Sequence, residues 1–358
     1  MARIDFDDVT VAVDGNIVLH NISLGIDDGE FVGVIGPSGS GKTALLRTLA
    51  GFTDVVRGRV LLDGIDVAKV KTADRDIGMV FQDPVLFAKR TVRRNVSFPL
   101  EIQRQDAAEI NRRVNAEVRS MHIEHLLGRR PSELSRGESQ LVQIARAMVR
   151  TPRVLLLDEP LASLDLRLQA RMRAELSMLQ AGYGVTTVMT TNDPDDAMSM
   201  PSRLMVIDSG RVAQIDTPAG VRKRPATIDA ALSTGECWLL PATVLRADEG
   251  FWLRLDDRDG NEACRWRAWA PALSSRAGET VMIGVRPDGV QIAPNGTITA
   301  RVRRVLPGSG GIALCEVGGR DIGVAARAGV RTDDIVNLRL DEFVVFDGVS
   351  GRSICWVG

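Results

Sequence analysis

Short apolar runs alternate with longer segments of helical periodicity through most of the chain. Four of these runs have the length of buried strands: residues 30–35, 77–82, 154–157 and 185–190. Segments 91–150 and 166–180 instead space their apolar positions three or four residues apart, as in amphipathic helices. This alternation predicts a largely parallel sheet covered by helices, extending to about residue 215.

The pattern changes after Thr217-Pro218. Basic and small residues at 222–225 and 233–235 predict a linker. Short strands with alternating apolar positions follow it: residues 281–286, 296–302 and 341–346. Turn signals at Pro307-Gly308 and Gly318-Gly319 separate them, which predicts a small all-β barrel or sandwich.

Length and composition support two domains. At 358 residues the chain is too long for one ordinary core, and all five tryptophans lie after residue 235. We therefore expect an α/β P-loop domain over residues 1–232, with a helical subdomain at about 89–152. A small all-β, OB-like domain is expected over residues 233–358.

The composition, 44% hydrophobic and 25% charged, is that of a soluble globular protein. The net charge of −1 gives no global attraction to nucleic acid or to an anionic membrane. Because no apolar run is long enough to span a bilayer and no signal-peptide pattern is visible, any membrane role has to come through a partner. The four cysteines lack metal-ligand spacing and are expected to be reduced.

A complete phosphate-binding pattern, G-x-x-x-x-G-K-[ST], lies between a predicted strand and a predicted helix. It consists of Gly36, Pro37, Ser38, Gly39, Ser40, Gly41, Lys42 and Thr43. Glycines let backbone N–H groups turn around phosphates, and the helix start adds the positive end of its dipole. Lys42 is expected to reach the β- and γ-phosphates, and the Thr43 hydroxyl to bind Mg²⁺. The alternative, a glycine-rich turn without function, is disfavoured by the complete pattern and its flanks. The chain is predicted to bind a nucleoside triphosphate.

Two carboxylates, Asp158 and Glu159, end the apolar strand 154–157. Asp158 is expected to hold Mg²⁺ through a water molecule, and Glu159 to orient and deprotonate the attacking water. Gln82, at the end of its own strand, offers a further oxygen ligand. An acidic pair at a strand end is often only a helix cap, but its combination with the phosphate loop favours a hydrolytic site.

The segment Leu134-Ser135-Arg136-Gly137-Glu138 lies between the phosphate loop and the acidic strand. Ser135 and Glu138 match an S-x-x-E capping box that opens a helix. Beyond this local role, the chain resembles the ATP-binding subunits of ABC transporters, whose signature sequence occupies this position. The motifs follow the family's order over about residues 4–220: phosphate loop 36–43, glutamine loop at Gln82, signature 134–138, Walker B strand 154–159, D-loop Ser163-Leu164-Asp165 and switch Thr191-Asn192-Asp193.

The segment Gly284-Val285-Arg286-Pro287-Asp288, followed by strands near 297–305, resembles the regulatory β-domain of importer ATPases of the maltose and other sugar-uptake type. Similar domains occur in ATPases for iron, polyamine and oxyanion import. OB-like barrels also bind nucleic acid, but these strands show no basic-aromatic groove pattern, so no nucleic-acid partner is expected.

The resemblance implies a peripheral ATPase subunit on the cytoplasmic face of the membrane, favoured for sugar import. Its implied partners are two transmembrane permease subunits, an extracytoplasmic solute-binding protein acting indirectly, and a second ATP-binding subunit, identical or different. The two ATP-binding subunits would close head to tail, each trapping ATP between its own phosphate loop and the other's signature.

The resemblance assigns roles to individual residues. Catalysis is assigned to Glu159, Asn192 and Gln82, and Mg²⁺ binding to Thr43, Gln82 and Asp158. Nucleotide binding is assigned to Val13, residues 36–43, Ala44, Ser135, Arg136, Gly137 and Glu138.

Four residues depart from the family pattern. Val13 replaces the aromatic residue that stacks on adenine, which would cost about 1–3 kcal/mol if the stacking energy for nucleic-acid bases applies. Arg136 and Glu138 replace the first glycine and the terminal glutamine of the signature. Asn192 replaces the switch histidine, whose contacts an uncharged amide reproduces only in part.

Two hypotheses follow: a working ATPase of reduced rate, favoured because Glu159 is retained, or an ATP-binding regulatory subunit with little hydrolysis. A soluble ABC protein of repair or translation is disfavoured, because such chains usually carry two ATP-binding domains.

Overall fold

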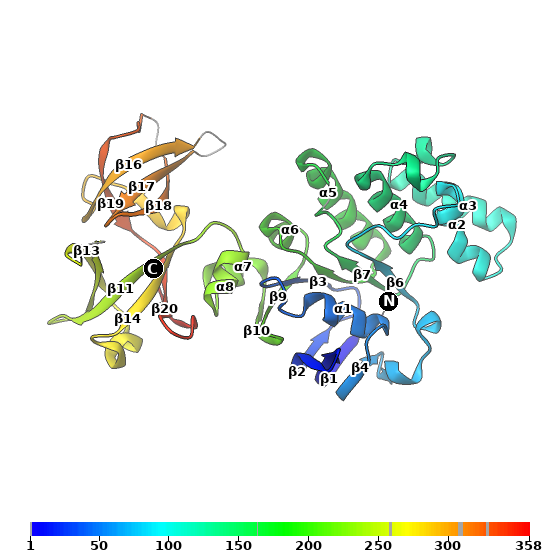
Figure 1. Cartoon of the computed structure of the whole chain (residues 1–358), viewed down its shortest axis with the longest axis horizontal. Helices are drawn as coiled ribbons and strands as arrows, with labels where there is room; N and C mark the ends of the chain where they lie inside the picture. The colour runs from blue at the N-terminus through cyan, green and yellow to red at the C-terminus, as the bar shows by residue number, and fades with distance from the viewer. Residues whose placement is uncertain (1, 163, 258–259, 307–310, 327–328) are drawn as a thin grey trace. The chain divides into compact units, whose positions relative to one another are not determined.

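The computed structural model describes residues 2–162, 164–257, 260–306, 311–326 and 329–358. The chain divides into two compact units, residues 1–219 and 220–358 (Figure 1). Ser163 of the expected D-loop and the expected turn at Pro307-Gly308 lie outside the described residues.

The N-terminal unit contains two sheets. Its strands are β1 (Ile4–Val13), β2 (Asn16–Ile26), β3 (Phe31–Ile35), β4 (Val55–Leu62), β5 (Ile65–Asp66), β6 (Ile77–Val80), β7 (Val154–Asp158), β8 (Thr186–Thr190), β9 (Arg203–Asp208) and β10 (Arg211–Asp216). Its helices are α1 (Lys42–Ala50), α2 (Val92–Ile102), α3 (Ala107–Ser120), α4 (Arg136–Met148), α5 (Leu166–Tyr183) and α6 (Pro194–Ser199), and α7 (Pro218–Lys223) runs into the second unit.

One sheet is antiparallel, in the order β2-β1-β4-β5. The other has the order β10-β9-β3-β8-β7-β6, and all its pairs are parallel except β10 with β9. The predicted largely parallel sheet is therefore confirmed. Because parallel strands end at one edge, the residues after β3, β6, β7 and β8 meet there.

Strand β7 shows how the parallel sheet is covered on both faces. Val154 and Leu156 pack in a core that includes α1 and the antiparallel sheet, whereas Leu155 and Leu157 pack in the core that includes α2, α3, α4 and α5. Successive strand residues point to opposite faces, so an uninterrupted apolar run is what a strand buried on both sides requires. The predicted helical segment 91–150 forms α2, α3 and α4.

A buried acid links two of these helices. Glu117 of α3 is only 3% exposed and accepts a hydrogen bond from the Tyr183 hydroxyl at the end of α5, and its other oxygen has no partner among the described residues. Burial raises the pKa of Glu117 to about 7. A carboxyl whose pKa is raised by folding stabilises the fold only while it is protonated, so this stability is lost as the pH rises towards 7.

Glu117→Gln is therefore expected to stabilise the protein above neutral pH. The amide keeps the acceptor for Tyr183 and removes the buried charge, so we expect a gain of roughly 2–3 kcal/mol at about pH 8.5 and little change at about pH 4.5. Urea denaturation at both pH values measures this difference, with the exposed Glu124→Gln as control. An equal change in the free energy of unfolding at the two pH values would contradict the prediction.

The C-terminal unit is built almost entirely of strands. These are β11 (Trp238–Arg246), β12 (Phe251–Asp256), β13 (Glu262–Ala268), β14 (Thr280–Val285), β15 (Val290–Ile292), β16 (Ile298–Leu306), β17 (Ile312–Val317), β18 (Arg320–Ala325), β19 (Ile335–Leu340), β20 (Phe343–Asp347) and β21 (Ser353–Val357). They form two antiparallel sheets, β13-β12-β11-β14-β20-β21 and β15-β19-β16-β17-β18, around one core. The all-β prediction is confirmed.

Helix α8 (Ile228–Ser233) precedes these strands. Its Ala231 packs against Val344 and Phe346 of β20. The contacts therefore group residues 220–232 with the C-terminal unit, whereas the predicted boundary lies after residue 232.

The β12–β13 hairpin groups basic and aromatic side chains, which differs from the expectation that the strands of this unit show no basic-aromatic pattern. Trp252 lies opposite Arg267 in the antiparallel register, and the guanidinium of Arg265 lies 5.1 Å from the Trp252 ring centre. Arg267 also lies 4.6 Å from the ring centre of Trp269. Side chains two residues apart share a face of a strand, which brings these basic and aromatic groups together.

Candidate functional site

The phosphate-binding pattern forms the loop between β3 and α1. Gly36 has a φ of 148°, and a Cβ atom there would lie 1.9 Å from the carbonyl oxygen of Ile207. Gly41 caps the helix with a φ of 107°, so α1 begins at Lys42, within the phosphate-binding pattern. Both glycines are required by backbone conformation, which supports the motif as a built structure.

Lys42 lies across this loop. Its ammonium group donates to the carbonyl oxygens of Gly36, at 2.7 Å, and Pro37, at 2.9 Å. The side chain is buried, and burial lowers its pKa, while the carboxylates of Glu159 and Asp158 oppose this shift. The structure thus places a cation between the loop and the acidic pair, where a phosphate group requires one.

The first carboxylate, Asp158, is the last residue of β7 and is 4% exposed. Its Oδ1 atom accepts hydrogen bonds from the Thr43 hydroxyl, at 3.1 Å, and from the Thr190 hydroxyl, at 2.7 Å. The structure therefore brings together two of the three predicted Mg²⁺ ligands. It also adds Thr190, which the sequence analysis missed, because its contact with Asp158 depends on the pairing of β7 with β8 in the sheet.

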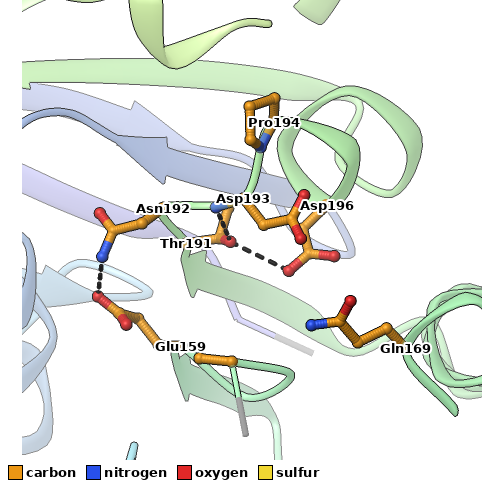
Figure 2. A pocket seen from close by; sticks show the side chains of 8 residues that line it. Glu159, Gln169, Thr191, Asn192, Asp193, Pro194 and Asp196 are labelled. Carbon is orange, nitrogen blue, oxygen red and sulfur yellow. Dashed lines mark hydrogen bonds between the residues drawn. The ribbon is translucent and has the colours of Figure 1, made fainter. Parts of the chain in front are cut away.

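The second carboxylate, Glu159, lies between two amide side chains. Gln82 Nε2 donates to its Oε2 atom at 3.0 Å. Asn192 Nδ2 donates to its Oε1 atom, and Figure 2 shows this second bond. Burial raises the pKa of Glu159; the charge of Lys42 opposes this shift, and Asp158 adds to it. A carboxylate of raised basicity, oriented by two donors, has the properties of a general base.

A cavity of about 430 Å³ opens beside this carboxylate (Figure 2). It is lined by Glu159, Ala162, Gln169, Thr191, Asn192, Asp193, Pro194 and Asp196. The structure thus brings together three residues for which the sequence predicts a catalytic role, because Gln82 and Asn192 both bond to Glu159.

Hydrogen bonds and an ion pair hold the loop that carries Asn192 to α5. The Thr191 hydroxyl donates to Asp196 Oδ2 at 3.0 Å, and Arg173 Nε of α5 donates to Asp196 Oδ1 at 2.6 Å. Arg173 also pairs with Asp193 at 3.2 Å. These bonds fix the switch segment to α5, so Asn192 has a defined position.

The signature segment forms the predicted capping box. Ser135 Oγ accepts from the Glu138 N–H at 3.2 Å, and Glu138 Oε2 accepts from the Ser135 N–H at 2.7 Å, a bond that lowers the pKa of Glu138. Arg136 pairs with Asp83 at 2.5 Å on the surface. A Cβ atom on Gly137 would lie 2.9 Å from Leu164. Among the described residues, no hydrogen bond or ion pair joins this turn to the phosphate loop.

Val13 ends β1 and is 40% exposed, at the hairpin where the resemblance places the base of the nucleotide. Its role in binding stays a prediction.

Comparison with known proteins decides the family. A model of the family described as ABC transporter matches residues 19–162. A spermidine/putrescine import ATP-binding protein from Thermotoga maritima is 37% identical over 276 residues, which cover 77% of this chain and 74% of the relative. This chain belongs to the ATP-binding subunits of ABC transporters. An sn-glycerol-3-phosphate import ATP-binding protein from Rhizobium johnstonii is 36% identical to this ABC subunit over 350 residues, which cover 96% of the chain and 95% of the relative.

Solved structures of ABC cassettes are also similar. A dimeric ATP-binding cassette in a post-hydrolysis state, bound to ADP and Pi, has a TM-score of 0.56 and 29% identity and covers 60% of this chain. A protein from Clostridium perfringens that is part of an ABC transporter complex has a TM-score of 0.57 and 31% identity; the match covers 61% of this chain and 89% of that protein. The expected family, P-loop fold and ATPase class are confirmed.

Proposed function

We propose that this ABC subunit hydrolyses ATP to power the import of a small polyhydroxylated solute, a sugar or a related polyol. The observation that supports this solute class is the match to the sn-glycerol-3-phosphate importer subunit, which extends over 96% of the chain and so includes the C-terminal unit. The similar cassette structures cover about the length of the N-terminal unit, so the C-terminal unit is the part in which importer subclasses can differ.

The hydrolytic roles follow from the site. Lys42 and the N–H groups of the phosphate loop bind the triphosphate. The Thr43 hydroxyl and the Asp158 carboxylate are adjacent hard oxygen donors, the type that Mg²⁺ prefers, so these residues fit the ion. An Mg²⁺ ion held by these residues would neutralise charge on the triphosphate. Glu159 accepts the proton of the attacking water, and Asn192 and Gln82 orient its carboxylate.

The proposed assembly places two ATP-binding subunits head to tail beneath two transmembrane permease subunits, at the cytoplasmic face of the membrane. Ser135 and Gly137 lie at the start of α4, where N–H groups and the helix dipole favour a phosphate. They would contact the γ-phosphate held by the other subunit. The extracytoplasmic solute-binding protein acts through the permeases. No helix among the described residues is long and apolar enough to cross a bilayer.

A polyamine is the second candidate solute. Spermidine/putrescine import subunits from Thermotoga maritima and Pseudomonas aeruginosa are 37% and 38% identical to this chain, over 77% and 78% of its length. The assignment of iron or an oxyanion as the transported solute rests only on the resemblance of the C-terminal segment.

The test is an uptake assay in membrane vesicles that contain the full importer with this subunit. ATP-dependent uptake of labelled sn-glycerol 3-phosphate or a sugar, lost with Lys42→Ala, is the expected result. Uptake of spermidine alone would overturn the solute class, and uptake unaffected by Lys42→Ala would overturn the role of this subunit.

A further inference from the structure

Thr190, the last residue of β8, contacts both residues of the acidic pair. Its side chain is fully buried. The hydroxyl donates to Asp158 Oδ1 at 2.7 Å and accepts from the Glu159 backbone N–H at 3.1 Å. The same N–H lies 3.1 Å from the Thr190 carbonyl oxygen. One hydroxyl group therefore joins the side chain of one carboxylate to the backbone of the other.

For Asp158, this contact fixes the carboxylate at the metal position. The same Oδ1 atom accepts from Thr43, so hydroxyl groups from two different elements determine its orientation. If Thr43 turns to a metal ion, Thr190 remains as the donor that keeps Asp158 in place. A partner that orients a ligand typically contributes about 10- to 100-fold to metal affinity or activity.

For Glu159, the contact supports an unusual backbone conformation. Its φ is 44°, in the left-handed region, which costs a residue other than glycine roughly 1–3 kcal/mol. The N–H group held by Thr190 stabilises this conformation. The conformation in turn places the Glu159 carboxylate between Gln82 and Asn192.

Thr187, on the same strand, shows what a buried threonine does without such a role. It is 1% exposed, and its hydroxyl donates to the carbonyl oxygen of Val185 at 3.1 Å, within its own chain segment. The Thr190 hydroxyl instead bonds across the sheet towards β7. Strands β7 and β8 are neighbours, and their register pairs Asp158 with Thr190.

We infer that Thr190 is a positioning residue for hydrolysis: its hydroxyl holds Asp158 for Mg²⁺ and keeps Glu159 in the conformation that presents its carboxylate to water. This inference rests on the proposed roles of the two carboxylates.

The test compares Thr190→Val, Thr190→Ala and Thr190→Ser with the parent and with the matched control Thr187→Val. Binding of a fluorescent ATP analogue (mant-ATP) is titrated with and without MgCl₂, and kcat and KM are measured in parallel. Thr190→Val and Thr190→Ala are expected to lose about 10- to 100-fold in the Mg²⁺-dependent part of the affinity and in kcat. Their affinity without Mg²⁺, which reports an intact phosphate loop, is expected to stay within about twofold of the parent.

The inference is supported if Thr190→Ser recovers the Mg²⁺-dependent affinity and kcat, because serine restores only the hydroxyl. Thr187→Val is expected to equal the parent in both quantities. The inference would be overturned if Thr190→Val and Thr190→Ala had the same Mg²⁺-dependent affinity and the same kcat as Thr187→Val. A loss that serine does not restore would also overturn it, since packing rather than the hydroxyl would then matter. If the parent shows no turnover, the proposed hydrolysis fails, but the Mg²⁺ dependence of binding still decides the role of Thr190.

Discussion

Glu159→Gln is expected to lower ATP turnover by about 10²- to 10⁴-fold, the contribution of a positioned general base, while ATP binding is retained. The replacement keeps the shape of the side chain but removes the proton acceptor. It also sets an amide against Gln82 Nε2 and Asn192 Nδ2, which both donate to the carboxylate in the parent, so one of these donors loses its acceptor.

Turnover of the purified importer with Glu159→Gln, beside the parent and the exposed Glu124→Gln, measures this effect. Loss of turnover only in the Glu159 variant establishes an ATPase with an asparagine in the switch. If the variant retains most of the parent's turnover, another group must activate the water. If parent and variant bind ATP but are equally inactive, the regulatory hypothesis replaces the working ATPase, and an intact ATPase partner has to be sought.

Gly36→Ala is expected to weaken ATP binding by at least about 100-fold, because small displacements of positioning groups have effects of this size. The new Cβ atom would lie 1.9 Å from the carbonyl oxygen of Ile207, so β9 or the loop must move. Lys42 donates to the Gly36 carbonyl oxygen, so movement of the loop also displaces the cation.

A titration with mant-ATP measures the loss, and circular dichroism checks the fold. Gly64→Ala is the matched control: Gly64 also has a positive φ, 78°, but a Cβ atom there meets nothing within 4 Å. The control separates backbone strain, about 1–2 kcal/mol for a left-handed residue, from the steric collision at Gly36. Equal affinity of Gly36→Ala and the parent would show that the loop tolerates this displacement.

Features built from residues that are contiguous in the chain could be predicted from the sequence. The phosphate loop depends on glycine positions and a lysine within residues 36–43, and its conformation follows locally. The buried strands before Gly36 and Asp158 were predictable because a strand covered on both faces is apolar throughout. The capping box at Ser135 and Glu138 was also predictable, because its two hydrogen bonds join residues only three positions apart.

The contacts between these segments could not be predicted, because they depend on the arrangement of the strands in the sheet. The sheet order β3-β8-β7-β6 differs from the chain order, so β8 lies between the strand before the phosphate loop and the strand of the acidic pair. That order, with the register that pairs Asp158 with Thr190, creates the Thr190 contacts. The bonds of Gln82 and Asn192 to Glu159 arise in the same way, from residues 77 and 33 positions apart. Local propensity carries no information about such pairings, because each depends on which strands lie side by side and on their register.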